Sequence, residues 1–525
     1  MSTPSGSAPG IAVPPPGEAA LPVSAARHRL ITLSAMLATV MQTLDLTIAN
    51  VALPHMQGSL SATREQVNWV LTSYIVVSAV VMPLTGFLAA RFGRKQLFVA
   101  SVALFTIASV LCGMAQTLPE MVLYRALQGA AGATIIPLSQ SLMLDINPRE
   151  KQGPAMALWG AGVTLGPILG PTIGGWLTEY YSWHWVFLIN LPIGILAIAG
   201  LIVSVPRSEP AHGIRFDAAG FLFLAVAISC AQLVLDRGQT LDWYESTEIW
   251  IETLLAAFAL YLFTVHMLTT DNPFLPRALF RDRNFMTSLA MAFTVGVMIL
   301  ATMALMPPFL QQLGGYTAFD TGLLLAPRGI GVSVTMILAG RLMTGHTDAR
   351  YVMLAGLLCI EISLIGMAQF TMHATTFDLL WTSIVQGIGL GLVFAPMTTL
   401  TTATLSPALR TDAASLYSLM RNLGSSFGVS IVVAELSRAI TINSAELGER
   451  LNPDAWRELA THMPVDPQTL TALVQSEVGR QAALIGYLND FRLLAVATLL
   501  AMPLVFLYRR PEPSAPAAMP SATAD

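Results

Sequence analysis

The stretch "LWGAGVTLGPILGPTIGGWL", residues 158–177, contains six glycines and two prolines and no charged residue. Glycine and proline are the poorest helix formers in water. Here they recur at steps of four residues, which gives the set Gly162, Gly166, Pro167, Gly170, Pro171 and Gly174. On a helix with 3.6 residues per turn this spacing makes a slowly winding stripe without side chains, which another helix backbone can approach closely. The stretch therefore predicts a specialised membrane helix at a seam that moves, and plain tight helix packing is the alternative.

The composition of the whole chain agrees with a membrane protein. The 525 residues are 54% hydrophobic and 11% charged, with a mean hydropathy of +0.63. Soluble domains carry about 25% charged residues, so most of this chain cannot face water. Long apolar runs recur from about residue 30 to residue 507, and each is long enough to cross a bilayer. The predicted class is an all-α polytopic membrane protein.

The apolar runs predict about fourteen spans in two related halves. The expected spans are 30–53, 67–90, 96–116, 119–145, 155–178, 185–205, 216–236, 249–269, 285–307, 319–343, 351–371, 377–403, 412–436 and 486–507. The segments "TGFLAARFGRK" (85–95) and "AGRLMTGHTDAR" (339–350) occupy equivalent loops of the two halves. Two six-helix bundles with a two-helix insert fit this count, and internal repeats are common in secondary transporters.

The sequence predicts five regions and one orientation. The regions are a disordered tail at 1–26, a bundle at 27–205, a two-helix insert at 206–270, a second bundle at 271–508 and a tail at 509–525. The second bundle includes a long charged segment, 437–484, which contains "PDAWRELATHM" at 453–463. Lysines and arginines concentrate in the loops on one side of the spans, which places both termini in the cytoplasm and 437–484 in the periplasm.

Two charges fall inside the predicted hydrocarbon region. A charge at that depth costs at least a few kcal/mol and is a functional hypothesis by default. Asp45 in the first span and Arg125 in the fourth lie at similar depths, with Gln42 and Gln128 on the same faces. The two charges can meet as a static ion pair that locks two helices. They can also form a proton carrier, because burial disfavours a charged carboxylate whereas a nearby arginine favours it.

Glu361, in the middle of the eleventh span, is a third intramembrane charge. It is a candidate second proton site or a counter-charge for a cationic cargo. Alternatively, it reaches the membrane surface or pairs with Arg328 or Arg421, which are themselves candidates for lining the cavity. Asp490 and Arg492 are expected to form an interfacial pair near the end of a helix.

Several classes of function lack support in the sequence. The three cysteines, Cys112, Cys230 and Cys359, all fall inside predicted spans, which argues against a disulfide framework and against a metal site. No Gly-Lys-Ser/Thr occurs, so no Walker motif binds ATP. "GSSFG" (424–428) lies in a membrane helix rather than at a strand-to-helix turn, so it is no nucleophile elbow. We expect a transporter without a cofactor, driven by an ion gradient or by the gradient of its cargo, and not an enzyme; the net charge of −4 is too small to indicate a nucleic-acid partner.

Six stretches together resemble the major facilitator superfamily and, within it, the fourteen-span drug/proton antiporters of the EmrB/QacA type. The loop "GFLAARFGRK" (86–95) and the fourth-span segment "RALQGAAGA" (125–133) are similar to superfamily signatures, and "GVTLGPILGPTIGG" (162–175) is similar to the antiporter signature. The branch itself is indicated by "LDLTIANVALP" (44–54), "WHWVFLINLPIG" (183–194) and "GYTAFDTGLLLAPRG" (315–329).

This resemblance implies a multidrug efflux antiporter of the inner membrane. It implies two rocking bundles that exchange protons for amphipathic or hydrophobic toxic compounds, with Asp45 and Arg125 in proton coupling. It also implies a loop that gates the cavity, formed by Gly86, Arg91, Gly93, Arg94 and Lys95. The partners it implies are an EmrA-like periplasmic adaptor and a TolC-like outer-membrane channel. This chain has Ala90 where the superfamily loop often has an acid, so the charge relay of that loop does not carry over.

Two other readings stay open at this stage. The chain can export one native metabolite, or it can be a membrane enzyme or sensor without transport activity. No HExxH motif occurs among the eight histidines, and the tails are too short to fold into an output domain. The substrate itself is not indicated by any residue pattern.

Overall fold

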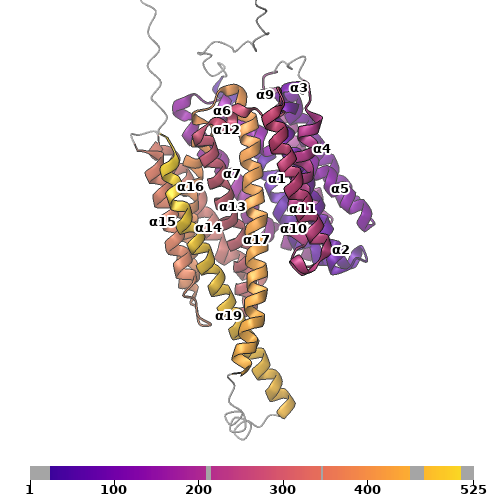
Figure 1. Cartoon of the computed structure of the whole chain (residues 1–525), viewed down its shortest axis with the longest axis vertical. Helices are drawn as coiled ribbons and strands as arrows, with labels where there is room; N and C mark the ends of the chain where they lie inside the picture. Colours follow the sequence, from indigo (N-terminus) through magenta and orange to yellow (C-terminus); the bar gives the residue numbers. More distant parts are fainter. Residues whose placement is uncertain (1–23, 208–214, 344–346, 450–465, 510–525) are drawn as a thin grey trace, which may run out of the picture.

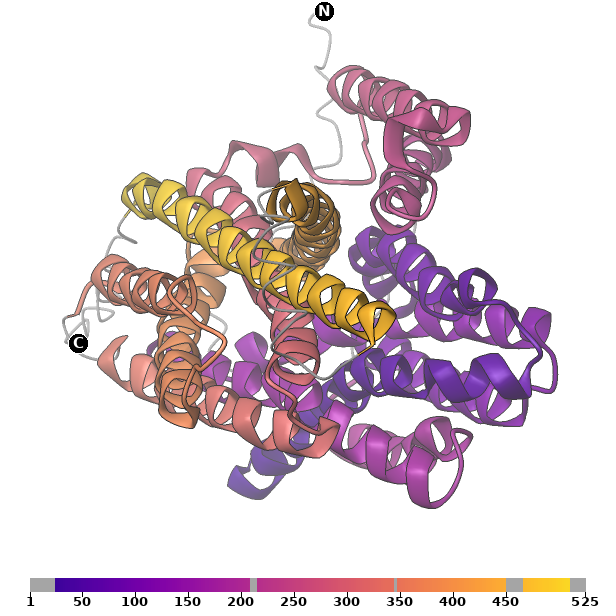
Figure 2. The ribbon, with the colours of Figure 1, turned by 90° about the horizontal axis from the view of Figure 1, so that it is seen from below.

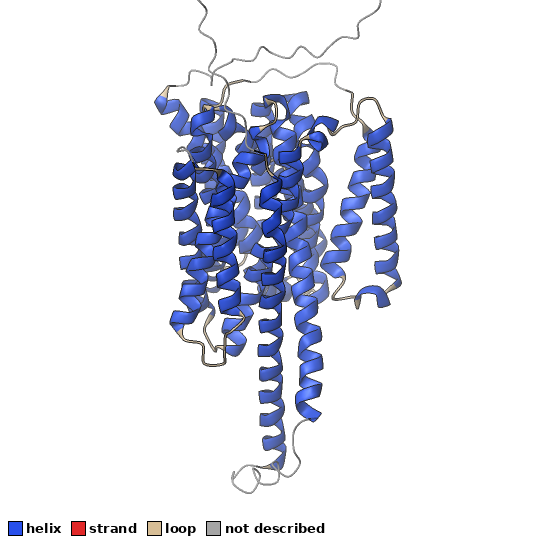
Figure 3. Ribbon diagram, turned by 60° about the vertical axis from the view of Figure 1, so that its left-hand side comes forward, coloured by secondary structure: helices blue, strands red, loops and turns tan. Residues whose placement is uncertain are grey.

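The computed structural model describes residues 24–207, 215–343, 347–449 and 466–509, and every regular element in these ranges is a helix (Figures 1 and 3). Thirteen of the helices in these ranges are long and apolar enough to cross a membrane. The all-α polytopic class expected from the composition is therefore confirmed. Of the tails expected at 1–26 and 509–525, residues 1–23 and 510–525 lie outside the described residues.

The helices follow the expected spans closely in the first half of the chain. Their bounds are α1 (Ala25–Ser59), α2 (Arg64–Val81), η1 (Met82–Leu84), α3 (Thr85–Phe92), α4 (Arg94–Met114), α5 (Leu118–Gly132), α6 (Ile135–Asp145), α7 (Arg149–Tyr180), α8 (Trp185–Leu188) and α9 (Asn190–Ser204). The next are α10 (Ala218–Arg237), η2 (Trp243–Glu245) and α11 (Thr247–Thr269).

The second half adds six long helices and several short ones. Their bounds are α12 (Arg277–Arg281), α13 (Arg283–Pro308), the π-helical turn η3 (Phe309–Leu313), α14 (Ala318–Met343), α15 (Ala349–Met367), α16 (Thr376–Ala403), η4 (Pro407–Leu409), α17 (Arg410–Glu449), α19 (Pro467–Ala501) and η5 (Met502–Leu507).

The expected span at 119–145 is formed by two helices in succession, α5 and α6. Each is shorter than a membrane crossing, so neither is among the thirteen long helices. The break falls at Ala133 and Thr134. The Thr134 hydroxyl donates to Ser101 Oγ at 2.6 Å and to the Ala131 carbonyl at 3.4 Å. A threonine that bonds back to the preceding turn competes with the helical ladder, which accounts for the interruption.

The segment between the last two spans is more helical than the sequence suggested. α17 continues beyond the expected end at 436 to Glu449, and α19 starts at Pro467, well before 486. Both helices project past the ends of the others (Figures 1 and 3). Pairs at helical spacing support the exposed part of α19: Glu477 accepts from Arg480 at 3.1 Å and from Gln481 at 2.8 Å. The expected helical pattern at 453–463 lies outside the described residues.

The buried apolar residues separate into clusters that follow the two halves of the chain. Two clusters contain only residues between Ile31 and Val205, whereas the third consists mainly of residues after Leu275. Seen from below, the N-terminal helices lie on one side and the C-terminal helices on the other, with α10 and α11 at the edge (Figure 2). This arrangement fits two bundles and an insert, although the exact domain boundaries stay a prediction.

Asp217 ties the two insert helices together. Its carboxylate accepts from the Gly220 N–H at 3.0 Å, from His266 Nε2 at 2.8 Å and from the Phe274 N–H at 3.3 Å. Burial by itself would raise the pKa of Asp217, but these three hydrogen bonds outweigh it and lower the pKa below the ordinary value. Asp217 thus caps α10 and holds it to α11 and to the chain that follows α11.

Candidate functional site

The structure brings Asp45 of α1 and Arg125 of α5 together inside the N-terminal half. Arg125 donates from a terminal guanidinium nitrogen to Asp45 Oδ2 at 2.7 Å, and the two side chains are 1% and 0% exposed. The depths of the two residues predicted this meeting correctly. An isolated charge in such a place is very unfavourable, so each residue depends on the other.

The Asp45 carboxylate is bound by three side chains from two other helices, α5 and α9. Its Oδ1 accepts from Gln128 Nε2 at 2.8 Å and from Asn190 Nδ2 at 2.8 Å, while Oδ2 accepts from Arg125. Asn190 also donates to Ser109 Oγ at 2.9 Å, which donates in turn to the Phe187 carbonyl at 2.9 Å. Both carboxylate oxygens are therefore hydrogen-bonded, and one of these bonds comes from a charged donor, which strengthens it.

Arg125 is held on its other sides as well. Its Nε donates to the Val70 carbonyl at 3.1 Å, and a terminal nitrogen donates to Gln128 Oε1 at 2.7 Å. The guanidinium carbon lies 4.3 Å from the centre of the Tyr74 ring and 5.6 Å from that of Phe187. These aromatic faces stabilise the cation in a buried environment.

Of the two glutamines expected beside the pair, one contacts both charges and the other contacts only Tyr74. Gln128 bridges Asp45 and Arg125, whereas Gln42 donates to Tyr74 Oη at 3.1 Å. The sequence analysis missed Asn190 and Tyr74. Asn190 lies within "WHWVFLINLPIG", and it is a polar side chain in a strongly apolar span, which is the signal that could have identified it.

The glycine stripe of α7 lies against α1 on both sides of Asp45. A Cβ atom added at Gly166 would lie 2.5 Å from the Thr43 carbonyl carbon and 2.6 Å from the Leu44 nitrogen. One added at Gly170 would meet Thr47, and one at Gly174 would meet Ile48. Thr47 Oγ1 donates to the Gly166 carbonyl at 3.2 Å. The absent side chains therefore allow two helix backbones to touch.

Gly162 adds little to this contact. An added Cβ at Gly162 would meet only the terminal methyl of Met36 closely, at 3.1 Å. Pro167 and Pro171 lie inside α7, which is helical throughout Arg149–Tyr180.

A different face of α7 contacts the C-terminal half. Gly340 of α14 packs on Pro154 and Ala157, where an added Cβ would lie 3.1 Å from the Pro154 Cα. Gly160 faces Met336 of α14. The stripe thus serves a contact within the N-terminal half, and the contact between the halves uses small residues displaced from it along α7.

The expected gating loop lies where α3 and α4 meet the start of α17. Gly93 adopts φ 86° between α3 and α4, a conformation that favours glycine. Arg94 pairs with Asp145 of α6, which also accepts from Arg410 of α17 at 3.1 Å. Lys95 donates to the Ile202 and Val205 carbonyls at 2.6 and 2.7 Å, and so caps the C-terminal end of α9.

Gly86 packs directly on the carboxylate of Asp412, in the first turn of α17. An acid from the second half of the chain therefore lies beside the loop that has Ala90 in place of the usual acid. Arg91 is exposed and joins no ion pair that the structure describes in this cluster. Through Asp145 and Asp412 the two halves are connected at this end of the molecule.

The other expected charges remain apart from each other. Arg328 in α14 and Arg421 in α17 are buried, and neither is paired with Glu361. One carboxylate oxygen of Glu361 is buried without a hydrogen-bond partner among the described residues. Arg492 donates to Asn489 at 3.3 Å rather than to Asp490, so the expected interfacial pair of Asp490 and Arg492 is wrong. Asp490 lies inside α19, and its side chain points into the protein.

The comparisons with known proteins agree with this geometry. Residues 35–429 match the model of the Major Facilitator Superfamily. The chain is 34% identical over 500 residues to the multidrug export protein EmrB of Haemophilus influenzae, which covers 93% of this chain and 97% of that relative. It is 36% identical over 499 residues to the fatty acid resistance protein FarB of Neisseria gonorrhoeae, covering 93% and 98%. EmrB of Escherichia coli K12 is 33% identical over 497 residues, covering 93% and 97%.

A solved structure has the same fold at low identity. The human organic anion transporter MFSD10 (TETRAN) superposes with a TM-score of 0.58 at 11% identity, covering 91% of this chain and 99% of the other. The recognition of the superfamily and of its EmrB-type branch from the six motifs is confirmed, as is the expectation that the chain is no enzyme. The chain belongs to the Major Facilitator Superfamily and is a multi-pass membrane transporter related to the EmrB and FarB exporters.

Proposed function

We propose that this protein is a proton-coupled efflux antiporter of the inner membrane that exports amphipathic or hydrophobic toxic compounds. Three relatives named for multidrug export or fatty acid resistance match over 93% of the chain, which supports export as the direction. The observation that carries the proton coupling is the buried Asp45–Arg125 pair. A carboxylate at this depth lowers stability, so its presence is best explained by a function.

The carboxylate of Asp45 takes up a proton only after it loses some of its donors. In the present conformation Arg125, Gln128 and Asn190 satisfy both oxygens, and protonation would break at least one of these bonds. A conformation that separates α1 from α5 or α9 exposes the carboxylate and favours protonation. Proton binding and the rearrangement of the bundle are therefore coupled through one network.

The glycine stripe and the loop between α3 and α4 act as the moving contacts in this proposal. The stripe allows α7 to pack against α1 next to Asp45, so a shift between these helices alters the surroundings of the carboxylate. The Arg94–Asp145–Arg410 cluster and the Gly86–Asp412 contact hold the two halves together at the other end. Release of this end opens the cavity to the cytoplasm, where both termini lie.

The projecting helices α17 and α19 support a contact with a periplasmic adaptor. EmrB-type exporters imply an EmrA-like adaptor and a TolC-like channel as partners, and these helices extend beyond the rest of the molecule (Figure 3). Deleting 440–480 and joining the ends with a short flexible linker is expected to spare efflux in vesicles but to abolish resistance in whole cells. Equal loss in both assays contradicts the adaptor contact.

A second candidate is the export of one native class of amphipathic molecule. The relative with 36% identity is named for resistance to fatty acids, so a long-chain acid is the specific alternative to a broad drug range. Competition by long-chain fatty acids against a cationic dye distinguishes the two. If vesicles take up a long-chain fatty acid but no dye, the second candidate is favoured. If they take up the dye, the broad drug range is favoured.

The test of the main proposal is transport into inverted membrane vesicles. Dye uptake that requires a proton gradient and collapses with an uncoupler is the expected result. Asp45→Asn keeps the size of the side chain but cannot cycle charge, so it is expected to insert and to bind dye with little pH dependence while losing proton-driven uptake. Cargo-induced proton release from purified Asp45→Asn protein that equals the parent's contradicts a role of Asp45 in coupling.

A further inference from the structure

A second buried carboxylate lies in the C-terminal half, and its surroundings differ from those of Asp45. The Asp490 side chain belongs to α19 and is 0% exposed. Both of its carboxylate oxygens are buried without a hydrogen-bond partner in the part of the chain that the structure describes. Asp45, in contrast, accepts three hydrogen bonds, one of them from an arginine.

Among the residues that the structure describes, no cation pairs with Asp490. Gly486, one turn earlier in α19, packs on Leu436 of α17, where an added Cβ would lie 3.0 Å from a Leu436 methyl. This contact places Asp490, one turn after Gly486, near the part of α17 that carries Glu435, the residue before Leu436. The nearest phenol on its own helix is Tyr487. Arg492 is exposed and donates to Asn489 instead.

The other elements packed against α19 contribute mainly apolar groups. They are α13, α15, η3 and η5. α15 carries Arg350 and Tyr351 in its first turn, followed by Cys359 and Glu361, and the only charged residue of α13 is Arg283, at its first position. Neither η3 nor η5 contains a charged residue.

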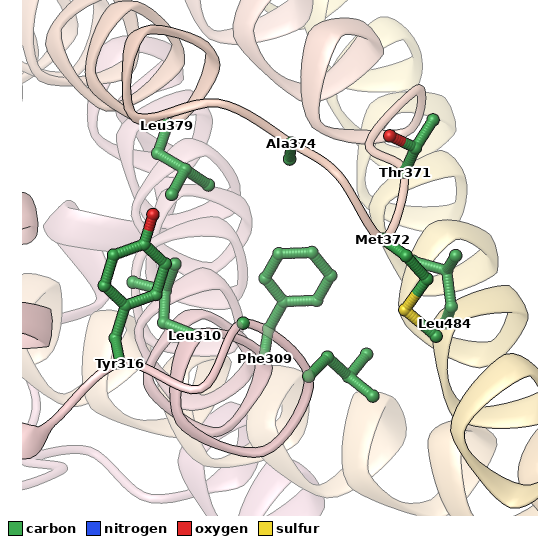
Figure 4. Close-up of a pocket in the computed structure, with 10 residues that line it drawn as sticks. Phe309, Leu310, Tyr316, Thr371, Met372, Ala374, Leu379 and Leu484 are labelled. Atoms are coloured by element: carbon green, nitrogen blue, oxygen red, sulfur yellow. The ribbon is translucent and has the colours of Figure 1, made fainter. Parts of the chain in front are cut away.

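Aromatic rings pack around this part of α19, and one of them also lines a small cavity. The centre of the Phe309 ring lies 5.4 Å from that of Tyr487 and 6.3 Å from that of Phe491. In α19, Tyr487 comes three residues before Asp490 and Phe491 directly follows it. Phe309 belongs to the π-helical turn η3, and such turns are frequent at functional sites. It also lines a cavity of about 20 Å³ together with Tyr316 and Leu484 (Figure 4), which is enough for one water molecule.

Burial without a hydrogen-bond partner favours the uncharged acid over the carboxylate at Asp490. An ionised carboxylate without a partner in an apolar interior costs several kcal/mol, and a neighbouring acid increases this penalty. The carboxylic acid avoids the penalty.

The geometry points to Asp490 as a second proton-binding site, located in the C-terminal half, with Glu435 as the group that exchanges its proton with the outer aqueous phase. Glu435 is exposed and lies at the end of the expected thirteenth span, from which α17 projects. A proton can therefore pass from bulk water to Glu435 and on to Asp490. This inference rests on the proposed function, since a proton site has a use only if transport is coupled to protons.

The first measurement is the infrared spectrum of the purified parent and of Asp490→Asn. The parent is expected to show the C=O stretching band of a buried carboxylic acid, and this band is expected to be absent from Asp490→Asn. Asp490→Glu keeps the carboxylic acid and is expected to show the band at a shifted frequency. This variant tests the assignment if Asp490→Asn does not insert into the membrane. Arg492→Gln is the matched control next to the site and is expected to leave the band unchanged.

The second measurement is proton release on addition of a lipophilic cationic dye to purified protein. If two carboxyls exchange protons, Asp490→Asn is expected to release about half as many protons per bound dye as the parent. Glu435→Gln is expected to keep the infrared band but to slow its hydrogen–deuterium exchange. A band that persists in Asp490→Asn, or proton release that is unchanged in it, overturns the inference. The proposed function fails separately, if parent vesicles show no uncoupler-sensitive uptake of dye.

Discussion

Replacing Gly166 with alanine is the sharpest test of the contact between α7 and α1. The added methyl would lie 2.5 Å from the Thr43 carbonyl carbon and 2.6 Å from the Leu44 nitrogen. Non-bonded carbon atoms normally approach to about 3.5–4.0 Å. The Thr43 hydroxyl, which the methyl would also meet, can rotate away, but the two backbone atoms cannot. The two helices must therefore separate by about 1 Å at this point.

The expected loss of stability is at the upper end of the range for overpacking, which is about 1–3 kcal/mol. The separation also weakens the hydrogen bond from Thr47 to the Gly166 carbonyl. Alanine is the better helix former and offsets about 0.5–1 kcal/mol. We expect a net loss of about 2 kcal/mol and, because Asp45 lies between the two contact points on α1, a loss of transport that exceeds the loss of folded protein.

Gly175 provides a matched control on the same helix. An added Cβ there would find its nearest neighbour, a Val51 methyl, at 4.0 Å. Gly175→Ala is therefore expected to keep or raise stability and to keep transport, whereas Gly162→Ala, which meets only the flexible Met36 methyl, is expected to fall in between. Thermal unfolding in detergent and uncoupler-sensitive dye uptake in vesicles measure the two effects. If Gly166→Ala and Gly175→Ala behave alike in both assays, the close contact does not govern transport.

Three further outcomes follow from the buried charges. Arg125→Ala leaves Asp45 as an uncompensated buried charge and is expected to destabilise the protein by about 3–5 kcal/mol, and adding Asp45→Asn is expected to recover much of the melting temperature without restoring transport. Gly86→Ala is expected to lower the melting temperature by displacing the Asp412 carboxylate, and combining it with Asp412→Ala is expected to recover it. The pKa of Asp217 is lower in the folded protein than in the unfolded chain. Its contribution to stability is therefore present above about pH 4 and is lost as the pH falls through the folded pKa. In denaturant titrations, the stability of Asp217→Asn is expected to depend less on acid than that of the parent.

The sequence alone was sufficient to predict the class, the family and the central ion pair. Hydropathy determines the spans, since lipid permits only segments that satisfy their own backbone hydrogen bonds. The depths of Asp45 and Arg125 then place them in the same layer, and the pairing follows because neither charge is tolerated alone. The branch followed from motifs such as 44–54 and 162–175, and the relatives confirm it.

The partners of each charge could not be predicted in the same way. Asn190 reaches Asp45 because α9 packs against α1 and α4, which is a matter of how helices turn about their own axes. Neither composition nor depth determines that rotation. The same applies to Asp490, which appeared to lie near the end of a helix because α19 was expected to begin at residue 486 rather than at Pro467. The polar residues before 486 suggested a loop, and they form the projecting part of the helix.

The glycine stripe and the ion pair are two parts of one arrangement. Gly166 contacts Thr43 and Leu44, Gly170 contacts Thr47, and Asp45 lies between these positions on α1 but points the other way, toward α5 and α9. Any sliding or tilting of α7 against α1 is therefore transmitted to the turn that carries Asp45. A side chain on the stripe would hold the two backbones apart and leave that turn free to move without α7. The helix breakers thus provide direct contact between a helix that also packs on the second half of the protein and the helix that carries the buried carboxylate.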